Sequence, residues 1–211
     1  MVRLIAENLT CRRSERTLFE GLSFTVNSGG ALLLTGPNGV GKTSLLRILA
    51  GLLNATGGGV RPEPDDDIPL PEHSCLIGVS NALKLALNLR EHVDFWLAAE
   101  STGARHSADD VLDAWNLIRI ADTPCGWLST GQRRRAALAR LSCSARAIWL
   151  LDEPLSGLDE PAARLLDAAV ARHRADGGLI VCASHQPLAW PDVERLALGP
   201  KVRPSAPDGP P

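Results

Sequence analysis

GPNGVGKT, at residues 36–43, matches the pattern G-x-x-x-x-G-K-[ST] at every fixed position. It lies between a β-forming apolar run, 31–35, and leucines and isoleucines that recur at helical spacing from Leu45. A strand, a glycine loop and a helix in this order form a P-loop, whose backbone N–H groups point at phosphate oxygens. A chance match in a glycine-rich turn is the weaker alternative, because both flanking elements stand where the mechanism requires them.

Each position of this motif predicts a contact with a nucleotide. Lys42 is expected to reach the β- and γ-phosphates, and the Thr43 hydroxyl is expected to bind Mg²⁺. The glycines let the chain curl, and the following helix adds the positive end of its dipole. The predicted nucleotide-binding residues of the loop are Gly36, Pro37, Asn38, Gly39, Val40, Gly41, Lys42, Thr43 and Ser44.

A second apolar run, 148–151, ends in two acidic residues, Asp152 and Glu153, followed by Pro154. A buried strand would deliver these carboxylates to the carboxyl edge of a sheet, where ligands bind in open α/β folds. We expect Asp152 to hold Mg²⁺ and Glu153 to act as general base or to orient the attacking water. Two acids at a strand end often only cap the next loop, but the P-loop upstream favours the catalytic interpretation.

Composition excludes several classes of protein. The 211 residues suffice for one domain, 45% of them are hydrophobic, and the formal net charge of −2 gives no reason to expect nucleic acid as a partner. The five cysteines are scattered without a C-x-x-C pair, so we expect small buried hydrophobes in a reducing compartment. No segment is apolar enough to span a bilayer, so a role at a membrane would need partner chains.

The remaining elements follow from periodicity and turn residues. The pattern predicts strands at 2–5, 22–26, 31–35, 147–151 and 179–184, an exposed loop at 61–72, mostly helix over 89–141, and a helix at about 161–174. Ser107 is a candidate helix start. Strand, helix and strand at the C-terminal spacing imply a right-handed crossover in a parallel sheet. From Gly199 the chain contains five prolines, and we expect no fixed structure there.

Several conspicuous side chains are given ordinary structural interpretations. The run Arg133 to Arg135 is interpreted as a solvated turn of helix. His92, His106 and His173 are interpreted as exposed histidines rather than ligands of a metal. Trp96 and Trp115 are expected in the core, with His92, Phe95, Trp96 and Ala99 sharing one helix face.

Leu128-Ser129-Thr130-Gly131-Gln132 resembles the LSGGQ signature of the ABC ATPase family, with Thr130 replacing the first glycine. The resemblance implies that Ser129, Gly131 and Gln132 bind the γ-phosphate of ATP held by an opposite subunit. It also implies that Ser156 to Asp159 is the D-loop, which runs along the subunit interface, with Asp159 near the nucleotide. His185 resembles the switch histidine, which contacts the γ-phosphate.

The family resemblance implies an α/β fold: a P-loop NTPase core with a mostly parallel sheet, an N-terminal antiparallel β subdomain and an inserted helical subdomain at about 85–143. The ATPase domain would span 1–198 and the tail 199–211. ATP and Mg²⁺ are the implied cofactors. The implied partners are integral membrane subunits and a second copy, in an ATP-dependent head-to-tail homodimer.

The chain departs from the family pattern at two places. Val79 and Ser80 stand where most relatives place a glutamine that senses Mg²⁺ and the membrane subunit. No aromatic residue occurs between Thr10 and Arg16, so Arg12 or Arg13 is expected to lie over the adenine.

Local features, including Ala82-Leu83-Lys84 and the stretch 89–96, resemble the subfamily of ATP-binding export proteins of cytochrome c biogenesis. That subfamily also lacks the glutamine. The resemblance implies a place on the cytoplasmic face of the bacterial inner membrane and a role in heme export or handling. The alternatives are an ABC ATPase for another small substrate, a soluble ABC ATPase outside transport, and a degenerate cassette that does not turn over.

Overall fold

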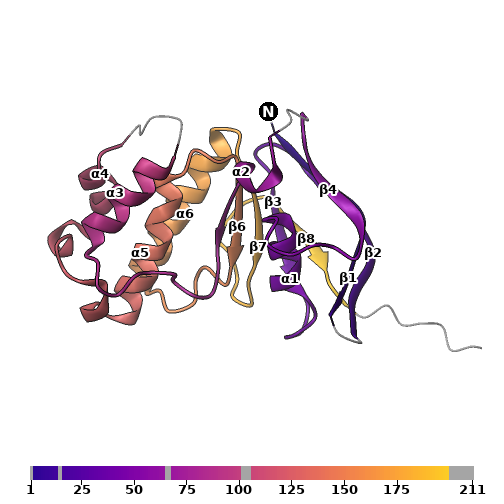
Figure 1. Ribbon diagram of the computed structural model, residues 1–211, viewed down its shortest axis with the longest axis horizontal. Coiled ribbons are helices and arrows are strands. Elements are labelled where there is room, and N and C mark those ends of the chain that lie inside the picture. Colours follow the sequence, from indigo (N-terminus) through magenta and orange to yellow (C-terminus); the bar gives the residue numbers. More distant parts are fainter. Residues whose placement is uncertain (1, 14–15, 65–67, 101–105, 200–211) are drawn as a thin grey trace, which may run out of the picture.

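The computed structural model describes residues 2–13, 16–64, 68–100 and 106–199, which form two β-sheets with helices packed around them (Figure 1). The predicted Pro-rich tail lies outside the described residues, except for Gly199.

The larger sheet has five parallel strands in the order β5-β6-β7-β3-β8. Its strands are β3 (Ala31–Thr35), β5 (Ser74–Ile77), β6 (Ile148–Asp152), β7 (Leu179–Ala183) and β8 (Val193–Ala197). Every residue of β6 and β7 is buried, because helices or the second sheet cover both faces. The predicted strands at 147–151 and 179–184 are confirmed to within one residue.

The smaller sheet is antiparallel, in the order β2-β1-β4, with β1 (Arg3–Arg13), β2 (Arg16–Val26) and β4 (Gly57–Glu63). The helix α1 (Lys42–Leu49) packs its buried leucines between the two sheets. Figure 1 shows this arrangement, with α1 between the parallel strands and β1. The expected fold class, with both a parallel and an antiparallel sheet, is therefore confirmed.

Most of the helical chain lies between β5 and β6. It consists of α3 (Leu89–Ala99), α4 (Ala108–Ala114), the 3₁₀ turns η1 (Ile118–Ile120) and η2 (Cys125–Trp127), and α5 (Thr130–Cys143). Ser107 begins α4 with a reciprocal capping box to Asp110, as predicted. The helix α6 (Glu160–Ala175) crosses from β6 to the adjacent parallel strand β7 and covers the face that α5 also covers (Figure 1).

The loop predicted at 61–72 is wrong at both ends. Residues 61–63 continue β4, and residues 70–73 form the short helix α2 (Leu70–His73). Prolines misled the prediction: Pro62 lies on an outer strand of its sheet, and Pro71 lies in the first turn of a helix, where the missing N–H costs nothing. The first two strands also extend well beyond the predicted 2–5 and 22–26, since their polar residues face solvent on one side.

The interpretation of His92 as exposed is wrong, since only 4% of its surface is accessible and its Nε2 lies 3.0 Å from the Lys84 amide nitrogen. His173 is half-buried and stacks on Trp149. Phe95 does not share the buried face of α3, because it is 64% exposed. Trp115 is confirmed in the core, Trp96 packs against it, and all five cysteines are buried.

None of the helices within the described ranges is long and apolar enough to cross a bilayer.

Candidate active site

Three adjacent parallel strands deliver the predicted catalytic residues to one edge of the sheet. Residue 183 of β7 pairs with both Leu34 of β3 and Asp152 of β6, so the three strands end at the same level. The P-loop follows β3, Glu153 follows β6, and His185 follows β7. Parallel pairing thus brings Glu153 and His185 to the P-loop, although both lie more than a hundred residues after it in the sequence.

The P-loop carries Lys42 at the first position of α1. The Lys42 Nζ donates to the carbonyls of Gly36 at 2.7 Å and Pro37 at 3.2 Å, and it lies 3.2 Å from His185 Nε2. Gly36 has a φ of 133°, and a Cβ there would lie 2.3 Å from the Leu198 carbonyl oxygen, so only glycine fits. Lys42 is buried, so its charge points into the loop rather than into solvent.

Thr43 and Asp152, the two residues predicted to bind Mg²⁺, lie next to each other. The Thr43 hydroxyl donates to Asp152 Oδ2 at 2.8 Å, and Asp152 is only 4% exposed. No Lys or Arg side chain within the described residues forms a salt bridge with this buried carboxylate. A hydroxyl and an unpaired carboxylate at this separation are the hard oxygen donors that Mg²⁺ prefers, so the residues fit the ion.

Glu153 stands directly opposite His185. The His185 backbone N–H donates to Glu153 Oε2 at 3.2 Å, and the two side chains approach to 3.7 Å. Glu153 has a φ of 47°, a left-handed conformation that costs a residue with a Cβ on the order of 1 kcal/mol. Its carboxylate keeps some contact with solvent, as a group that accepts a proton from water requires.

The signature turn begins α5. Ser129 is the N-cap, and its hydroxyl accepts from the Gln132 N–H while the Gln132 side chain accepts from the Ser129 N–H. Ser129 and Thr130 are exposed, and Gly131 faces the Gly157 carbonyl. Among the described residues, no hydrogen bond joins this turn to the P-loop. The exposed Ser129 and Thr130 therefore leave the N-terminus of α5 accessible to solvent.

Asp159 serves a structural purpose in the chain. Its carboxylate accepts from the Ala162 N–H at 2.9 Å and so caps α6. It also lines a pocket of about 330 Å³ between the start of α6 and the segment after His185. No hydrogen bond within the described residues connects its side chain to Lys42, Asp152 or Glu153.

Arg134 was missed by the sequence analysis, which interpreted the run 133–135 as solvated. Arg134 is 3% exposed and donates to the carbonyls of Asp152, Glu153 and Pro154. The available signal was its helical spacing, since Leu138 and Leu141 lie four and seven residues further along the same buried face.

The other departures from the family pattern remain as the sequence indicated. Val79 and Ser80 are both exposed after β5, and Arg12 and Arg13 are exposed at the end of β1. Asn81, rather than either predicted position, places an amide near α5, because its Oδ1 accepts from Arg134 at 3.4 Å.

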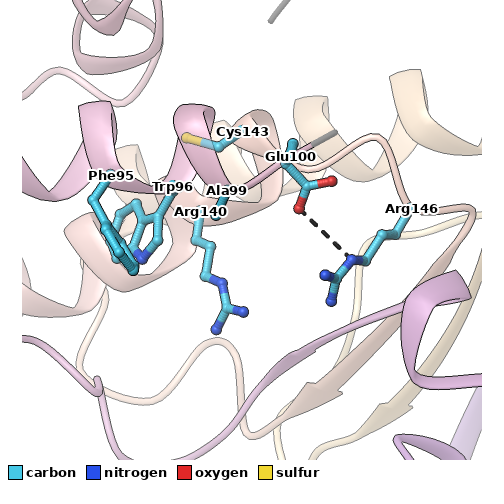
Figure 2. Close-up of a pocket in the computed structure, with 7 residues that line it drawn as sticks. All are labelled: Phe95, Trp96, Ala99, Glu100, Arg140, Cys143 and Arg146. Carbon is cyan, nitrogen blue, oxygen red and sulfur yellow. Dashed lines mark ion pairs between the residues drawn. The ribbon is translucent and has the colours of Figure 1, made fainter. Parts of the chain in front are cut away.

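A separate groove of about 180 Å³ lies between α3 and the C-terminal half of α5 (Figure 2). Arg140 points into it, and Glu100 forms an ion pair with Arg146 at 3.6 Å across one end. None of the predicted catalytic residues lines this groove.

Comparisons with known proteins show the family to which the chain belongs. A sequence profile described as "ABC transporter" matches residues 19–156. The cytochrome c biogenesis ATP-binding export protein CcmA of Sphingopyxis alaskensis is 43% identical over 198 residues, which are 94% of this chain and 97% of that protein. CcmA of Mesorhizobium japonicum is 44% identical over 94% of this chain and 98% of its own length.

Solved structures share the fold. A protein from Pyrococcus furiosus described as an ABC transporter ATP-binding protein superposes with a TM-score of 0.77 at 20% identity, covering 93% of this chain and 97% of that one. An ABC transporter cassette solved in its ADP conformation gives 0.70 at 22% identity, covering 89% and 82%.

Proposed function

The chain belongs to the ABC transporter ATP-binding family, and from that premise we propose that it is the ATP-hydrolysing subunit of a transporter that handles heme for cytochrome c biogenesis. The observation that carries the catalytic part is the convergence of Lys42, Asp152, Glu153 and His185 at one sheet edge. The relatives named for cytochrome c biogenesis match nearly the whole chain, which supports that role over another small substrate.

The contacts support distinct roles for the catalytic residues. Phosphate oxygens would replace the Gly36 and Pro37 carbonyls as acceptors for Lys42. His185 would contact the γ-phosphate, because its ring already lies beside Lys42 Nζ. Glu153 would accept the proton of the attacking water, with its carboxylate fixed by the His185 N–H. A degenerate cassette, which would bind ATP without turnover, is disfavoured because all of these groups are present at the same edge of the sheet.

Thr43 and Asp152 would hold Mg²⁺, which neutralises charge on the β- and γ-phosphates when it is bound. The remaining P-loop residues, 36–41 and Ser44, would surround the phosphates through backbone N–H groups.

A second copy of the chain would complete the site. Ser129, Gly131 and Gln132 form a partly exposed helix N-terminus, which favours an anion. No hydrogen bond within the described residues joins it to the P-loop of its own chain. A head-to-tail homodimer would place this turn over the γ-phosphate bound by the partner. In that arrangement, the segment 156–159 would run along the interface.

The family implies membrane-subunit partners, and we place the chain on the cytoplasmic face of the inner membrane. Exposed apolar side chains support such a contact: Leu85 and Trp127 are 57% and 83% exposed, and the Gly126 N–H donates to the Leu85 carbonyl, which keeps the two segments together. The proposed ATPase domain is 1–198, with residues 85–143 as its helical part.

The substitution Glu153→Gln tests the assignment. It keeps the side chain's shape and removes its basicity, so kcat should fall by about 10²- to 10⁴-fold while ATP still binds. Phosphate release and equilibrium nucleotide binding would be measured on the same preparation. Turnover at the level of the unmodified protein would remove Glu153 from this role.

Purification from native membranes tests the partner and the pathway. The tagged chain should copurify with integral membrane subunits, and cells carrying Glu153→Gln should lose covalently bound heme in their c-type cytochromes. Copurification with ribosomes, or unaffected cytochromes, would contradict the transporter role in this pathway.

A further inference from the structure

We propose that Arg134 is a positioning residue for ATP hydrolysis: it holds the backbone of Glu153 in its left-handed conformation and ties it to the connection between β5 and α3. This inference rests on the proposed function, because it concerns the residue assigned as general base.

Arg134 reaches two separate segments from α5. On one side, Nη2 donates to the Glu153 carbonyl at 2.7 Å and the Asp152 carbonyl at 3.2 Å, and Nε donates to the Pro154 carbonyl at 3.3 Å. On the other side, Nη1 donates to the Gly78 carbonyl at 2.8 Å and to Asn81 Oδ1 at 3.4 Å. A planar fork with several N–H groups can satisfy both sides at once, whereas a lysine ammonium cannot.

The burial of the Arg134 charge requires a physical explanation. Arg134 forms no salt bridge within the described residues, and its charge is solvated almost entirely by carbonyl oxygens. Burial lowers the pKa of Arg134, and the nearby Asp152 and Glu153 carboxylates partly offset that effect. An apolar residue would fill the same helix face without this desolvation cost, so packing alone does not account for an arginine.

Arg134 contacts the backbone of Glu153, which has a strained conformation. The φ of Glu153 is 47°, and its carbonyl accepts from both Arg134 and the Ser156 N–H at 3.1 Å. The direction of the Glu153 side chain depends on this peptide, because a return to ordinary φ would swing the carboxylate away from the His185 N–H. Arg134 therefore acts on the reaction through Glu153, without touching the nucleotide.

Position 135 on the same helix offers a matched control. Arg135 also donates to carbonyl oxygens, those of Trp115 at 3.4 Å and Asn116 at 3.1 Å, but these lie at the end of α4, away from the site. Arg134→Met and Arg135→Met thus remove the same group from one helix, with and without a link to Glu153.

The experiment measures the ATP affinity and the kcat of both variants in the full chain. Arg134→Met should lower kcat by about tenfold to a hundredfold, as expected for a displaced catalytic group, and change the Kd for ATP less than about threefold. Arg135→Met should keep the kcat and the Kd for ATP of the unmodified protein.

A double-mutant cycle with Glu153→Gln separates positioning from general destabilisation. If Arg134 acts through Glu153, Arg134→Met should leave the residual turnover of Glu153→Gln unchanged. An equal drop in both backgrounds, or equal kcat values for the two methionine variants, would overturn the proposal.

If Arg134→Met does not fold, Arg134→Lys provides the test, because a lysine cannot reach both segments. This variant should keep its ATP affinity but lose kcat, and an unchanged kcat would overturn the proposal. Failure of the proposed function would look different, since Glu153→Gln itself would then retain full turnover.

Discussion

His173 shows at the residue scale how packing changes the chemistry of one side chain. Its ring lies 3.8 Å from the ring of Trp149 at an interplanar angle of 8°, and its Nε2 lies 3.2 Å from the Ala147 carbonyl oxygen. Burial lowers the pKa of His173 below the ordinary 6.5, an effect that its contacts with Leu179, Ala147 and Asp176 only partly oppose. The folded protein therefore favours the neutral imidazole.

This lowered pKa predicts a pH-dependent stability. The unfolded chain binds a proton at His173 more readily than the folded one, so the contribution is present above about pH 6.5 and is lost as the pH falls towards the folded-state value. In urea unfolding between pH 7.5 and pH 5, the unmodified protein should lose more stability than His173→Phe, which keeps a stacking ring that does not titrate. Parallel pH curves for the two proteins would contradict this account.

At the element scale, α4 and α5 begin with the same kind of N-terminal cap. Ser107 and Ser129 are both N-caps with capping boxes, to Asp110 and Gln132. The first cap lies before α4 in the helical region, and the second is the predicted contact for a partner's nucleotide. Two chemically equal caps in one chain allow helix stability to be separated from nucleotide binding.

Ser129→Ala and Ser107→Ala should each destabilise the protein by about 1 kcal/mol, because each leaves helix N–H groups without their acceptor. Only Ser129→Ala should also lower ATPase activity and ATP-dependent dimer formation. Thermal unfolding and phosphate release, measured on both variants, check this difference. Equal activity in the two would argue that Ser129 is only a cap.

At the scale of the whole molecule, the proposed dimer follows from the separation of the signature turn from the P-loop. Within the described chain, no hydrogen bond joins Ser129 to Lys42, and in the arrangement that we propose a second copy completes the site. A head-to-tail dimer then contains two sites, each built from one chain's P-loop and the other chain's signature turn.

This geometry predicts complementation in mixtures. Lys42→Ala and Ser129→Arg should each be inactive alone, because every site in either homodimer contains one defect. Mixed dimers hold one site with neither substitution, so mixing should restore nucleotide trapping in up to about half of the sites of mixed dimers. Trapped radiolabelled ATP would measure it, and mixtures no better than the separate variants would contradict the head-to-tail arrangement.

The sequence determined the parts that depend on local chemistry and period. The P-loop follows from fixed glycine, lysine and threonine positions, the caps at Ser107 and Ser129 from one residue each, and the buried strands from unbroken apolar runs. These signals lie within a few residues of the structure that they specify, so sequence patterns were sufficient to identify them.

Tertiary structure alone decided the rest. Arg134 is buried because carbonyls from two distant segments converge on it, and His92 is buried because the Lys84 backbone folds back over its ring. The left-handed φ of Glu153 likewise depends on partners from β7 and α5. From the sequence alone, a charged or polar residue is predicted to be exposed. Only the folded chain brings close the oxygen atoms that replace water as its hydrogen-bond partners.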